Sequence, residues 1–210
     1  MRYGECLGCS KVFIIGITGG TGAGKTSALR ALKNLGALVL DCDAIYHQLL
    51  SESMELKSEI GAKFGNVLNG GEIDRERLGE IVFSDPAALL DLNAIAHKFV
   101  SEETDRRIAK WKEQGGTVAA IDAIALVESG RGEKCDVVIG ITAPVETRIA
   151  RIMKRDGITR KQAEMRINAQ KPDSFFERNC DYILESKYDT PEKFEEKCRE
   201  FFAQLIGRSR

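Results

Sequence analysis

The sequence lacks the features that mark several large classes of protein. No apolar run approaches the roughly 18 residues of a membrane-spanning helix, and the opening MRYGECLGCSK has no apolar stretch typical of a signal peptide. Lys and Arg number 31 against 32 Asp and Glu, so the chain has no general excess of positive charge with which to bind nucleic acid. We therefore expect a cytoplasmic protein that binds neither membranes nor nucleic acid.

The six cysteines are too scattered for a disulfide framework. They stand at positions 6, 9, 42, 135, 180 and 198, which suits free thiols in a reducing compartment. Cys6 and Cys9 form a C-x-x-C pair, but no second pair follows at the spacing of a zinc site. We therefore interpret residues 1–11 as an N-terminal leader that carries two free thiols.

Short apolar runs separated by helical patterns predict an α/β protein. Five segments have the pattern of buried strands: 12–18, 37–41, 117–124, 136–142 and 181–185. Helices with clear start signals lie between them, including one that opens on a capping-box pair, Thr159 and Gln162. Strands that alternate with helices form a parallel sheet with helices on both faces, and we predict that fold class here.

The stretch 44–112 interrupts this alternation. Its pattern is helical, with turns at FGNVLNGGE and FSDP. We interpret it as an insertion between the second and third strands that covers their carboxyl ends, the edge at which open sheets of this class bind ligands. The predicted core then comprises residues 12–43 and 113–206.

The glycine-rich stretch GITGGTGAGKTS (16–27) predicts a phosphate site. Gly19, Gly24, Lys25 and Thr26 match the P-loop pattern G-x-x-x-x-G-K-S/T, directly after a predicted strand and at the start of a predicted helix. Backbone N–H groups of such a loop surround phosphate oxygens, Lys25 would bridge the β- and γ-phosphates, and the Thr26 hydroxyl would ligate Mg²⁺. The expected nucleotide contacts are Gly20, Thr21, Gly22, Ala23, Gly24, Lys25, Thr26 and Ser27.

Three carboxylates follow predicted strands at the ligand edge. Asp41 and Asp43 end the second strand, and residues two apart in an extended segment face the same way. A carboxylate that accepts a hydroxyl proton assists phosphoryl transfer to an alcohol. We favour that role for Asp43, whereas Asp41 has two open readings, a functional one and a helix cap. Asp122 ends the third strand, where a ligand of Mg²⁺-bound water often lies in P-loop proteins.

An arginine cluster predicts a mobile lid at about 148–170. The cluster comprises Arg148, Arg151, Arg155, Arg160 and Arg166. Guanidinium groups stabilise charge on a transferring phosphoryl group and help to exclude water. A solvated helix face is the equally weighted alternative. Within the cluster Arg151 and Arg155 are four residues apart and therefore share a helix face.

Four stretches, in this order, resemble dephospho-coenzyme A kinases: GITGGTGAGKTS, LDCDAI, the run IDRERLGEIVFSDPAALLDLNAIAHKFV (73–100) and RIMKRDGITRKQAEMRINAQ (151–170). The resemblance extends over roughly residues 12–206. It implies a P-loop kinase that moves the γ-phosphate of ATP to the ribose 3′-hydroxyl of dephospho-CoA, with Mg²⁺, in the last step of coenzyme A synthesis.

The resemblance also implies roles for individual residues. Asp43 would be the base, and Arg151 and Arg155 of the lid would act on the phosphoryl group. The insertion 44–112 would bind the acceptor through Asp74, Arg75, Asn93 and His97. His97 has an ordinary alternative as a helix residue packed between segments. A P-loop kinase of another small acceptor, such as a nucleoside monophosphate, is the alternative function.

Three places depart from the family pattern. The family's D-x-P-L-L-x-E reads DAIALVE from Asp122 to Glu128, which changes the local turn but keeps both acids. The family's His-Pro reads His97-Lys98, which removes a rigid turn. The family's A-D-x-V-I-x-N reads CDYILES, where we assign Glu185 to the place of the asparagine and expect an altered contribution to the adenine pocket.

Overall fold

The computed structural model describes residues 11–188 and 190–208, and the chain divides into two compact units. Unit 1 comprises Met1–Leu40 and Ile108–Arg210, and unit 2 comprises Asp41–Arg107. The C-x-x-C pair, Cys6 and Cys9, lies outside the described residues. Within the described part, none of the helices combines the length and hydropathy that a bilayer crossing requires.

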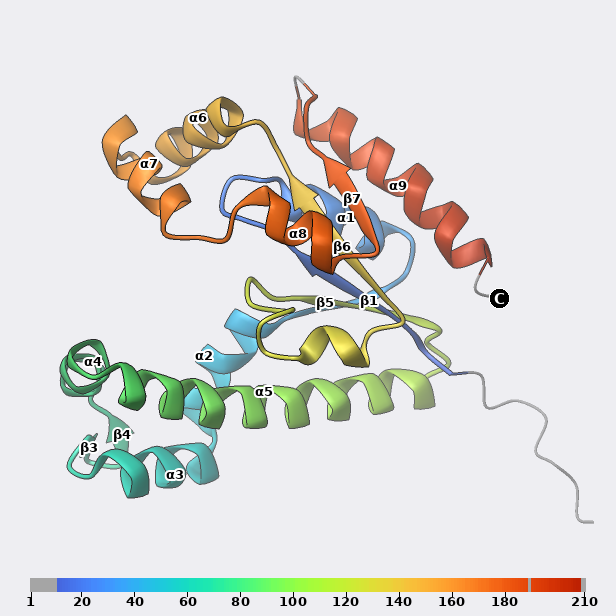
Figure 1. The fold of residues 1–210 in the computed structure, drawn as a ribbon. Coiled ribbons are helices and arrows are strands. Elements are labelled where there is room, and N and C mark those ends of the chain that lie inside the picture. Colours follow the sequence, from blue (N-terminus) through green and yellow to red (C-terminus); the bar gives the residue numbers. More distant parts are fainter. Residues whose placement is uncertain (1–10, 189, 209–210) are drawn as a thin grey trace, which may run out of the picture. The chain divides into compact units, whose positions relative to one another are not determined.

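Unit 1 is built on a five-stranded sheet with the order β2-β5-β1-β6-β7 (Figure 1). The strands are β1 (Phe13–Thr18), β2 (Leu38–Asp41), β5 (Val118–Asp122), β6 (Val137–Thr142) and β7 (Tyr182–Glu185). The pairs β1–β5, β1–β6 and β6–β7 are parallel. The predicted α/β class is therefore confirmed, and the register pairs Ile17 with Asp122 at the strand ends that lead into the site.

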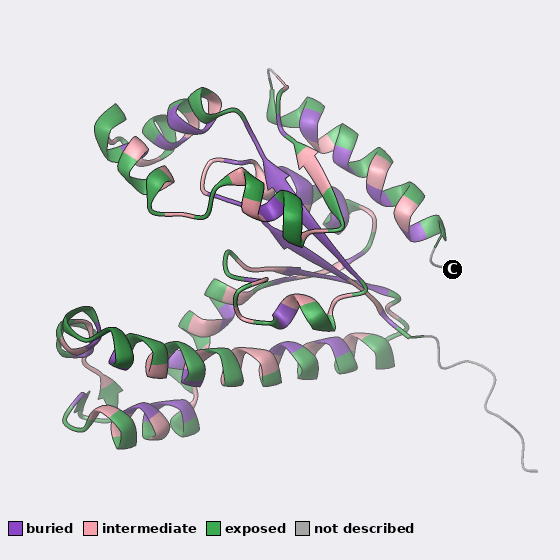
Figure 2. Cartoon of the chain, in the orientation of Figure 1, coloured by how far each residue is buried: buried purple, intermediate pink, exposed green. Residues whose placement is uncertain are grey.

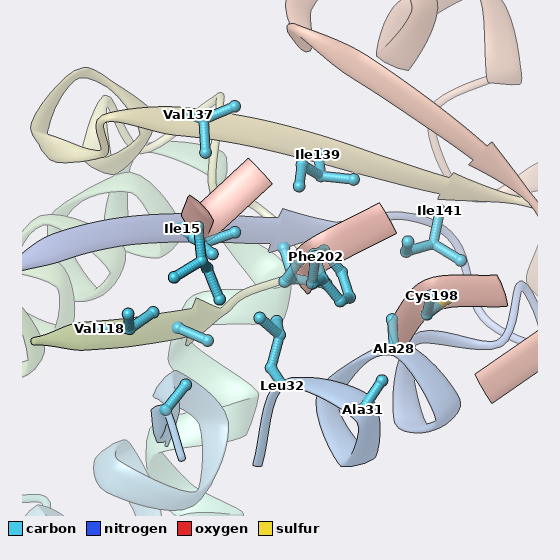
Figure 3. Close-up of a cluster of buried hydrophobic side chains, with 14 of the residues drawn as sticks. Ile15, Ala28, Ala31, Leu32, Val118, Val137, Ile139, Ile141, Cys198 and Phe202 are labelled. Carbon is cyan, nitrogen blue, oxygen red and sulfur yellow. The ribbon is translucent and has the colours of Figure 1, made fainter. Parts of the chain in front are cut away.

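Two helices pack together on one face of this sheet, α1 (Lys25–Asn34) and α9 (Pro191–Arg208). Ile15, Ile139 and Ile141 of the central strands meet Leu32 and Phe202 of these helices in the main core (Figure 3). Burial is concentrated in the strands and on the inward helix faces (Figure 2). The core thereby fixes β1 and α1, the two elements that hold the glycine-rich loop between them.

On the opposite face of the sheet, the loop after β5 and helix α8 pack closely on the strands because glycines of the strands face them. A Cβ on Gly16 would lie 2.6 Å from Cδ2 of Leu126, a buried residue of the loop after β5. A Cβ on Gly140 would lie 2.7 Å from Cδ1 of Ile183 and 3.2 Å from Cβ of Phe176, in helix α8 (Asp173–Asn179). The loop after β5 and helix α8 are therefore held against the strands that carry the site.

Two aspartates complete the hydrogen bonding at the start of the strands. Asp136 Oδ2 accepts from Ile14 N at 2.8 Å, and Asp181 Oδ2 accepts from Val138 N at 2.7 Å. Each carboxylate stands just before one strand and binds an N–H of the neighbouring strand. Asp181, the first residue of DYILE, is thus used in the sheet itself.

Helix α9 packs on the core along one stripe of its surface. Its buried residues are Phe194, Cys198, Phe202 and Ile206, while Phe201 and Leu205 are only partly buried. The helix continues through Gly207 to Arg208. Spacings of four residues put Phe194 and Cys198 on the same face as Phe202.

Unit 2 is mainly helical and has its own core. Its elements are α2 (Cys42–Glu52), α3 (Met54–Phe64), β3 (Leu68–Asn69), β4 (Glu72–Ile73), α4 (Arg75–Ser84) and the first part of α5 (Pro86–Glu113). Leu56, Ile60 and Val67 are fully buried in this core. The stretch predicted as a turn in a helical segment contains a small antiparallel hairpin, in which Gly70 and Gly71 have φ of 59° and 88°. Positive φ at both central residues is what a two-residue hairpin turn requires.

Helix α5 is continuous through His97 and Lys98. A lysine can donate its backbone N–H within a helix, which proline cannot. The Lys98 side chain forms an ion pair with Glu59 Oε2 of α3 at 2.8 Å. The departure from His-Pro therefore leaves an uninterrupted helix that is tied to its neighbour within unit 2.

Candidate nucleotide site

The glycine-rich loop links the end of β1 to the start of α1. Gly19, Gly22 and Gly24 have φ of 140°, 74° and 108°, a backbone conformation that residues with a Cβ rarely adopt. Lys25 Nζ donates to the Gly19 carbonyl oxygen at 2.9 Å and so lies across the mouth of the loop. This is a phosphate-loop conformation, with a lysine and a helix N-terminus at one end of it.

Two of the predicted contact residues differ in exposure. The Thr26 side chain is exposed, whereas that of Ser27 is 6% exposed and faces the core. Ser27 N also donates to Gly24 O at 3.0 Å as part of the first turn of α1. The Thr26 hydroxyl is therefore the better placed of the two to meet a ligand.

The glycines are also required by the protein that surrounds the loop. A Cβ on Gly20 would lie 2.2 Å from Nη2 of Arg148, and one on Gly22 would lie 2.9 Å from the Arg148 carbonyl oxygen. A Cβ on Gly24 would lie 3.0 Å from Oγ of Ser186. The loop is thus packed tightly on its outer side, by helix α6 (Val145–Asp156) and by the end of β7.

Arginines of α6 bind this outer side. Arg148 is 3% exposed, and its Nε donates to Thr21 O at 3.0 Å. Arg151 Nη1 donates to Gly22 O at 3.2 Å, and Arg155 Nη2 donates to Thr21 Oγ1 at 3.3 Å. The three arginines share one face of α6, and in this structure they hold the loop.

The other two arginines of the cluster form surface ion pairs. Arg160, at the start of helix α7 (Arg160–Asn168), binds Glu146 at 2.6 Å and Glu164 at 2.7 Å. Arg166 binds Asp156. Helices α6 and α7 pack on each other through Ile149, Ile152 and Ala163, and the predicted capping box of Thr159 and Gln162 is confirmed. The solvated-face reading therefore describes Arg160 and Arg166, whereas the lid role of the cluster stays a prediction.

The donor set for a metal ion has the composition that Mg²⁺ prefers. Asp122 ends β5 beside Ile17, and its Oδ1 is buried. With the exposed Thr26 hydroxyl it offers two hard oxygen ligands. Within the described residues, no three His, Cys, Asp or Glu side chains gather as a metal site. Kinases commonly hold Mg²⁺ by one or two protein oxygens together with substrate phosphates, so these two residues fit such an ion.

The turn after Asp122 forms although its sequence departs from the family pattern. Thr18 Oγ1 donates to Ile124 O at 3.0 Å, Leu126 is fully buried, and Ser129 N donates to Ala125 O at 2.9 Å. Glu128 is exposed. A cavity of about 360 Å³ opens here beside the loop, and its lining comprises Gly20, Ile124, Glu128, Ala169, Gln170, Lys171 and Phe176.

Asp41 and Asp43 both belong to unit 2 and do not lie in one extended segment. Asp41 is the N-cap of α2, and its Oδ1 accepts from Ala44 N at 3.0 Å. Asp43 is exposed in the first turn of that helix. The expectation that the two carboxylates face the same way along a strand was wrong, because the helix begins directly after Asp41.

The other expected acceptor residues also lie in unit 2. Asp74 is the N-cap of α4, and its side chain accepts from Arg77 N at 3.1 Å. Arg75 is exposed. Burial raises the pKa of nearby Tyr46, and the charge of Arg75 offsets part of that rise. Asn93 and His97 are both exposed and four residues apart on α5, so they share one face. His97 is accordingly not packed between segments.

Sequence reasoning assigned no role to two residues that bind the loop. Gln170 Oε1 accepts from Thr21 N at 2.8 Å, and Ser186 Oγ accepts from Arg151 Nη2 at 3.0 Å. In the pattern A-D-x-V-I-x-N, read in register from Cys180, the asparagine corresponds to Ser186. The assignment of that place to Glu185 was therefore wrong. The register of this pattern points to Ser186, and Gln170 is the last residue of the stretch 151–170 that carries the resemblance.

Comparisons with known proteins match most of the chain. The model of the dephospho-CoA kinase family matches residues 13–192. A dephospho-CoA kinase of Thermobifida fusca is 38% identical over 196 residues, which cover 92% of this chain and 96% of that protein. One of Geobacter sulfurreducens is 34% identical over 193 residues, covering 91% and 98%.

Solved structures share the fold. A Thermus thermophilus protein superposes with a TM-score of 0.77 at 28% identity, covering 94% of this chain and 98% of that one. A shikimate kinase of Acinetobacter baumannii, solved with shikimate, superposes with a TM-score of 0.52 at 16% identity, covering 93% and 96%. At that identity the likeness concerns the fold alone.

Proposed function

The chain belongs to the dephospho-CoA kinase family, and we propose that it transfers the γ-phosphate of ATP to the ribose 3′-hydroxyl of dephospho-CoA, giving coenzyme A and ADP. The observation that carries this proposal is the phosphate loop of residues 19–26, set between β1 and α1 in a chain that matches the family along most of its length. Free thiols at the four described cysteines agree with a cytoplasmic location, which is part of the proposal.

Binding of the triphosphate would use groups that the loop already holds in place. The N–H groups of residues 22–26 and the N-terminus of α1 favour negative charge. Lys25 Nζ, now on Gly19 O at 2.9 Å, lies at the mouth of the loop and would move onto the β- and γ-phosphates. Arg151 and Arg155, as proposed catalytic residues, would keep the loop in shape and add positive charge beside it.

Thr26 and Asp122 would hold Mg²⁺. When bound, the ion neutralises charge on the phosphates as the terminal group departs. The Thr26 hydroxyl would be a direct ligand, and the Asp122 carboxylate would bind the ion or one of its waters. The contribution of this chain is to keep both oxygens on rigid elements, the first turn of α1 and the end of β5.

On the acceptor side, Asp43 would accept the proton of the ribose hydroxyl. Its carboxylate is exposed and is not used as the cap of α2, a role that Asp41 fills. Arg75, Asn93 and His97 are exposed in the same unit and could bind the acceptor, while Asp74 supports them by capping α4. A general base of this kind typically contributes about 10² to 10⁴ in rate.

A coupled assay of ADP release tests the proposal directly. Dephospho-CoA, AMP and shikimate would be offered as acceptors under identical conditions, with acceptor-free ATP hydrolysis subtracted. Turnover that depends on dephospho-CoA and yields coenzyme A supports the proposal. Turnover with AMP or shikimate but none with dephospho-CoA would replace it by the alternative of a P-loop kinase with another small acceptor.

A further inference from the structure

The backbone of Thr21 is held through both its N–H and its carbonyl group by side chains that come from the 148–170 segment. Its N–H donates to Gln170 Oε1 at 2.8 Å, and its carbonyl oxygen accepts from Arg148 Nε at 3.0 Å. Arg148 Nη2 donates to the same Gln170 Oε1 at 3.3 Å. The three residues therefore form a closed ring of hydrogen bonds, in which Gln170 Oε1 accepts twice.

The charged member of the ring, Arg148, is buried. Arg148 is 3% exposed, and its remaining Nη1 donates to Asp173 Oδ1 at 3.4 Å. Hydrogen bonds from a charged donor are about twice as strong as neutral ones, and a buried guanidinium that loses an acceptor is costly. Gln170 is itself fixed, since its backbone N donates to Ile167 O at 3.1 Å at the end of α7.

The position of the ring explains why such a support is needed. Thr21 leads directly into Gly22 and Gly24, whose positive φ values set the directions of the amides that follow. Amide dipoles that converge on one point repel each other until an anion arrives. Glycine adds no side chain that would hold the backbone, so a bare loop would leave this conformation readily. Anchors on the outer side stop that movement.

We propose that Gln170 is a positioning residue that preorganises the phosphate loop by accepting the Thr21 N–H and the Arg148 guanidinium together. It deepens the proposed function because it rests on the loop as the ATP site. Gln170 acts through the loop and is not itself assigned a contact with the nucleotide. If the free loop is ordered for only a fraction of the time, the apparent affinity for ATP falls to that fraction of the intrinsic affinity. The loop of the ATP-bound enzyme is ordered in either case, so kcat at saturating ATP is little affected.

The test uses two variants. Gln170→Met keeps the length of the side chain and removes the hydrogen-bond acceptor, whereas Gln170→Glu keeps the acceptor. Affinity for ATP is measured by titration without acceptor substrate, and kcat at saturating ATP and dephospho-CoA. We expect Gln170→Met to weaken ATP binding by about tenfold while kcat stays within about threefold. Gln170→Glu should recover most of the affinity, because its carboxylate oxygens accept from Thr21 N–H and pair with Arg148.

Gln162→Met is the matched control on the same segment. Gln162 completes the capping box of α7 through hydrogen bonds with Thr159, so its loss should lower the melting temperature and leave ATP affinity unchanged. The inference is overturned if Gln170→Met binds ATP like the wild type, or if the Gln170 and Gln162 variants lower affinity equally.

The same measurements separate this inference from the proposed function. A wild-type protein that binds ATP but does not phosphorylate dephospho-CoA overturns the assigned reaction, while the titrations still decide the role of Gln170. A wild-type protein that does not bind ATP overturns both.

Discussion

Arg151 and Ser186 form a hydrogen bond of 3.0 Å between Nη2 and Oγ, and this bond ties helix α6 to the end of β7. Nη1 of the same guanidinium donates to the carbonyl oxygens of Gly22 and Ala23 at 3.2 and 3.4 Å. Partial burial lowers the pKa of Arg151, yet arginine stays charged at neutral pH. Ser186 is 1% exposed and cannot turn to solvent. Arg151 is therefore part of the structure of the loop, in addition to its proposed catalytic role.

Replacing Arg151 by alanine is expected to affect stability and activity together. The variant leaves the carbonyl oxygens of the loop and the buried Ser186 hydroxyl with fewer partners. We expect kcat/KM for ATP to fall by roughly tenfold to a hundredfold and the melting temperature to fall by several degrees. Arg160→Ala is the control, because exposed ion pairs contribute little. An unchanged melting temperature in Arg151→Ala would show that Arg151 does not hold the loop.

Gly22→Ala and Gly36→Ala separate backbone strain from tight packing. Gly36, just beyond the end of α1, has φ of 83° and nothing within 4 Å of an added Cβ. Its substitution should cost about 1–2 kcal/mol of unfolding free energy from the left-handed backbone alone. At Gly22, with φ of 74°, the Cβ would also meet the Arg148 backbone at 2.9 Å. The added cost should be roughly 1–3 kcal/mol.

Urea unfolding of the two glycine variants measures this difference, and ATP titration adds a functional readout. Gly22→Ala should bind ATP far more weakly than Gly36→Ala, since only the first distorts the loop. Equal unfolding free energies for the two variants would mean that α6 yields easily, and would contradict the tight packing seen here.

The predictions that succeeded rest on local signals. The spacing of glycines and lysine in residues 19–26 predicts the phosphate loop, and continuous apolar runs predict the strands. Thr159 and Gln162 form a capping box within one helical turn. Such features need no knowledge of distant residues. The hairpin at 68–73 was missed for a different reason: its strands have two residues each, although the sequence NGG carries the turn chemistry.

The features that were missed depend on tertiary contacts. Gln170 reaches Thr21 across 149 positions of sequence, and Ser186 meets Arg151 across 35. No local pattern predicts either contact. Asp43 was placed in an extended segment as a continuation of the strand predicted at 37–41, whereas the cap at Asp41 starts the helix at Cys42. At Asp41 the chain can either continue as a strand or start a helix, and the side-chain cap favours the helix.

Three thiols should be unreactive in the folded protein. Burial raises the pKa of Cys135 and of Cys180 to about 11 and that of Cys198 to about 12. With a pKa near 11, about one thiol in a thousand is ionised at pH 8, and the thiolate is the reactive form. Alkylation at these sites should therefore be slow and should rise about tenfold per pH unit. Peptide mapping by mass spectrometry measures each site separately.

The same raised pKa values predict a loss of stability at alkaline pH. The folded chain keeps these thiols protonated above the ordinary thiol pKa, where the unfolded chain releases the protons. Unfolding is therefore favoured increasingly as pH rises through 9 towards 11. Cys198→Ala should reduce that slope, with its own large-to-small cost visible equally at pH 7. Fast alkylation of Cys198 at pH 8 under native conditions would contradict its burial.

Asp43 and Asp41 offer a matched pair for the proposed base. Asparagine caps a helix about as well as aspartate, so Asp41→Asn should keep the bond to Ala44 N and leave stability almost unchanged. Asp43→Asn removes a carboxylate that has no capping role, and an amide cannot take up a proton from the acceptor hydroxyl. We expect kcat with dephospho-CoA to fall by about a hundredfold or more in Asp43→Asn and to stay within about threefold in Asp41→Asn.

ATP affinity decides what such a loss of kcat means. If Asp43 acts in proton transfer, Asp43→Asn binds ATP as the wild type does, because the nucleotide contacts belong to the loop of residues 20–27. A drop in ATP affinity that matches the drop in kcat would place Asp43 among the nucleotide or metal contacts. A nearly normal kcat in Asp43→Asn, or a large loss in Asp41→Asn, would assign the base to another residue, since the two substitutions make the same chemical change two positions apart.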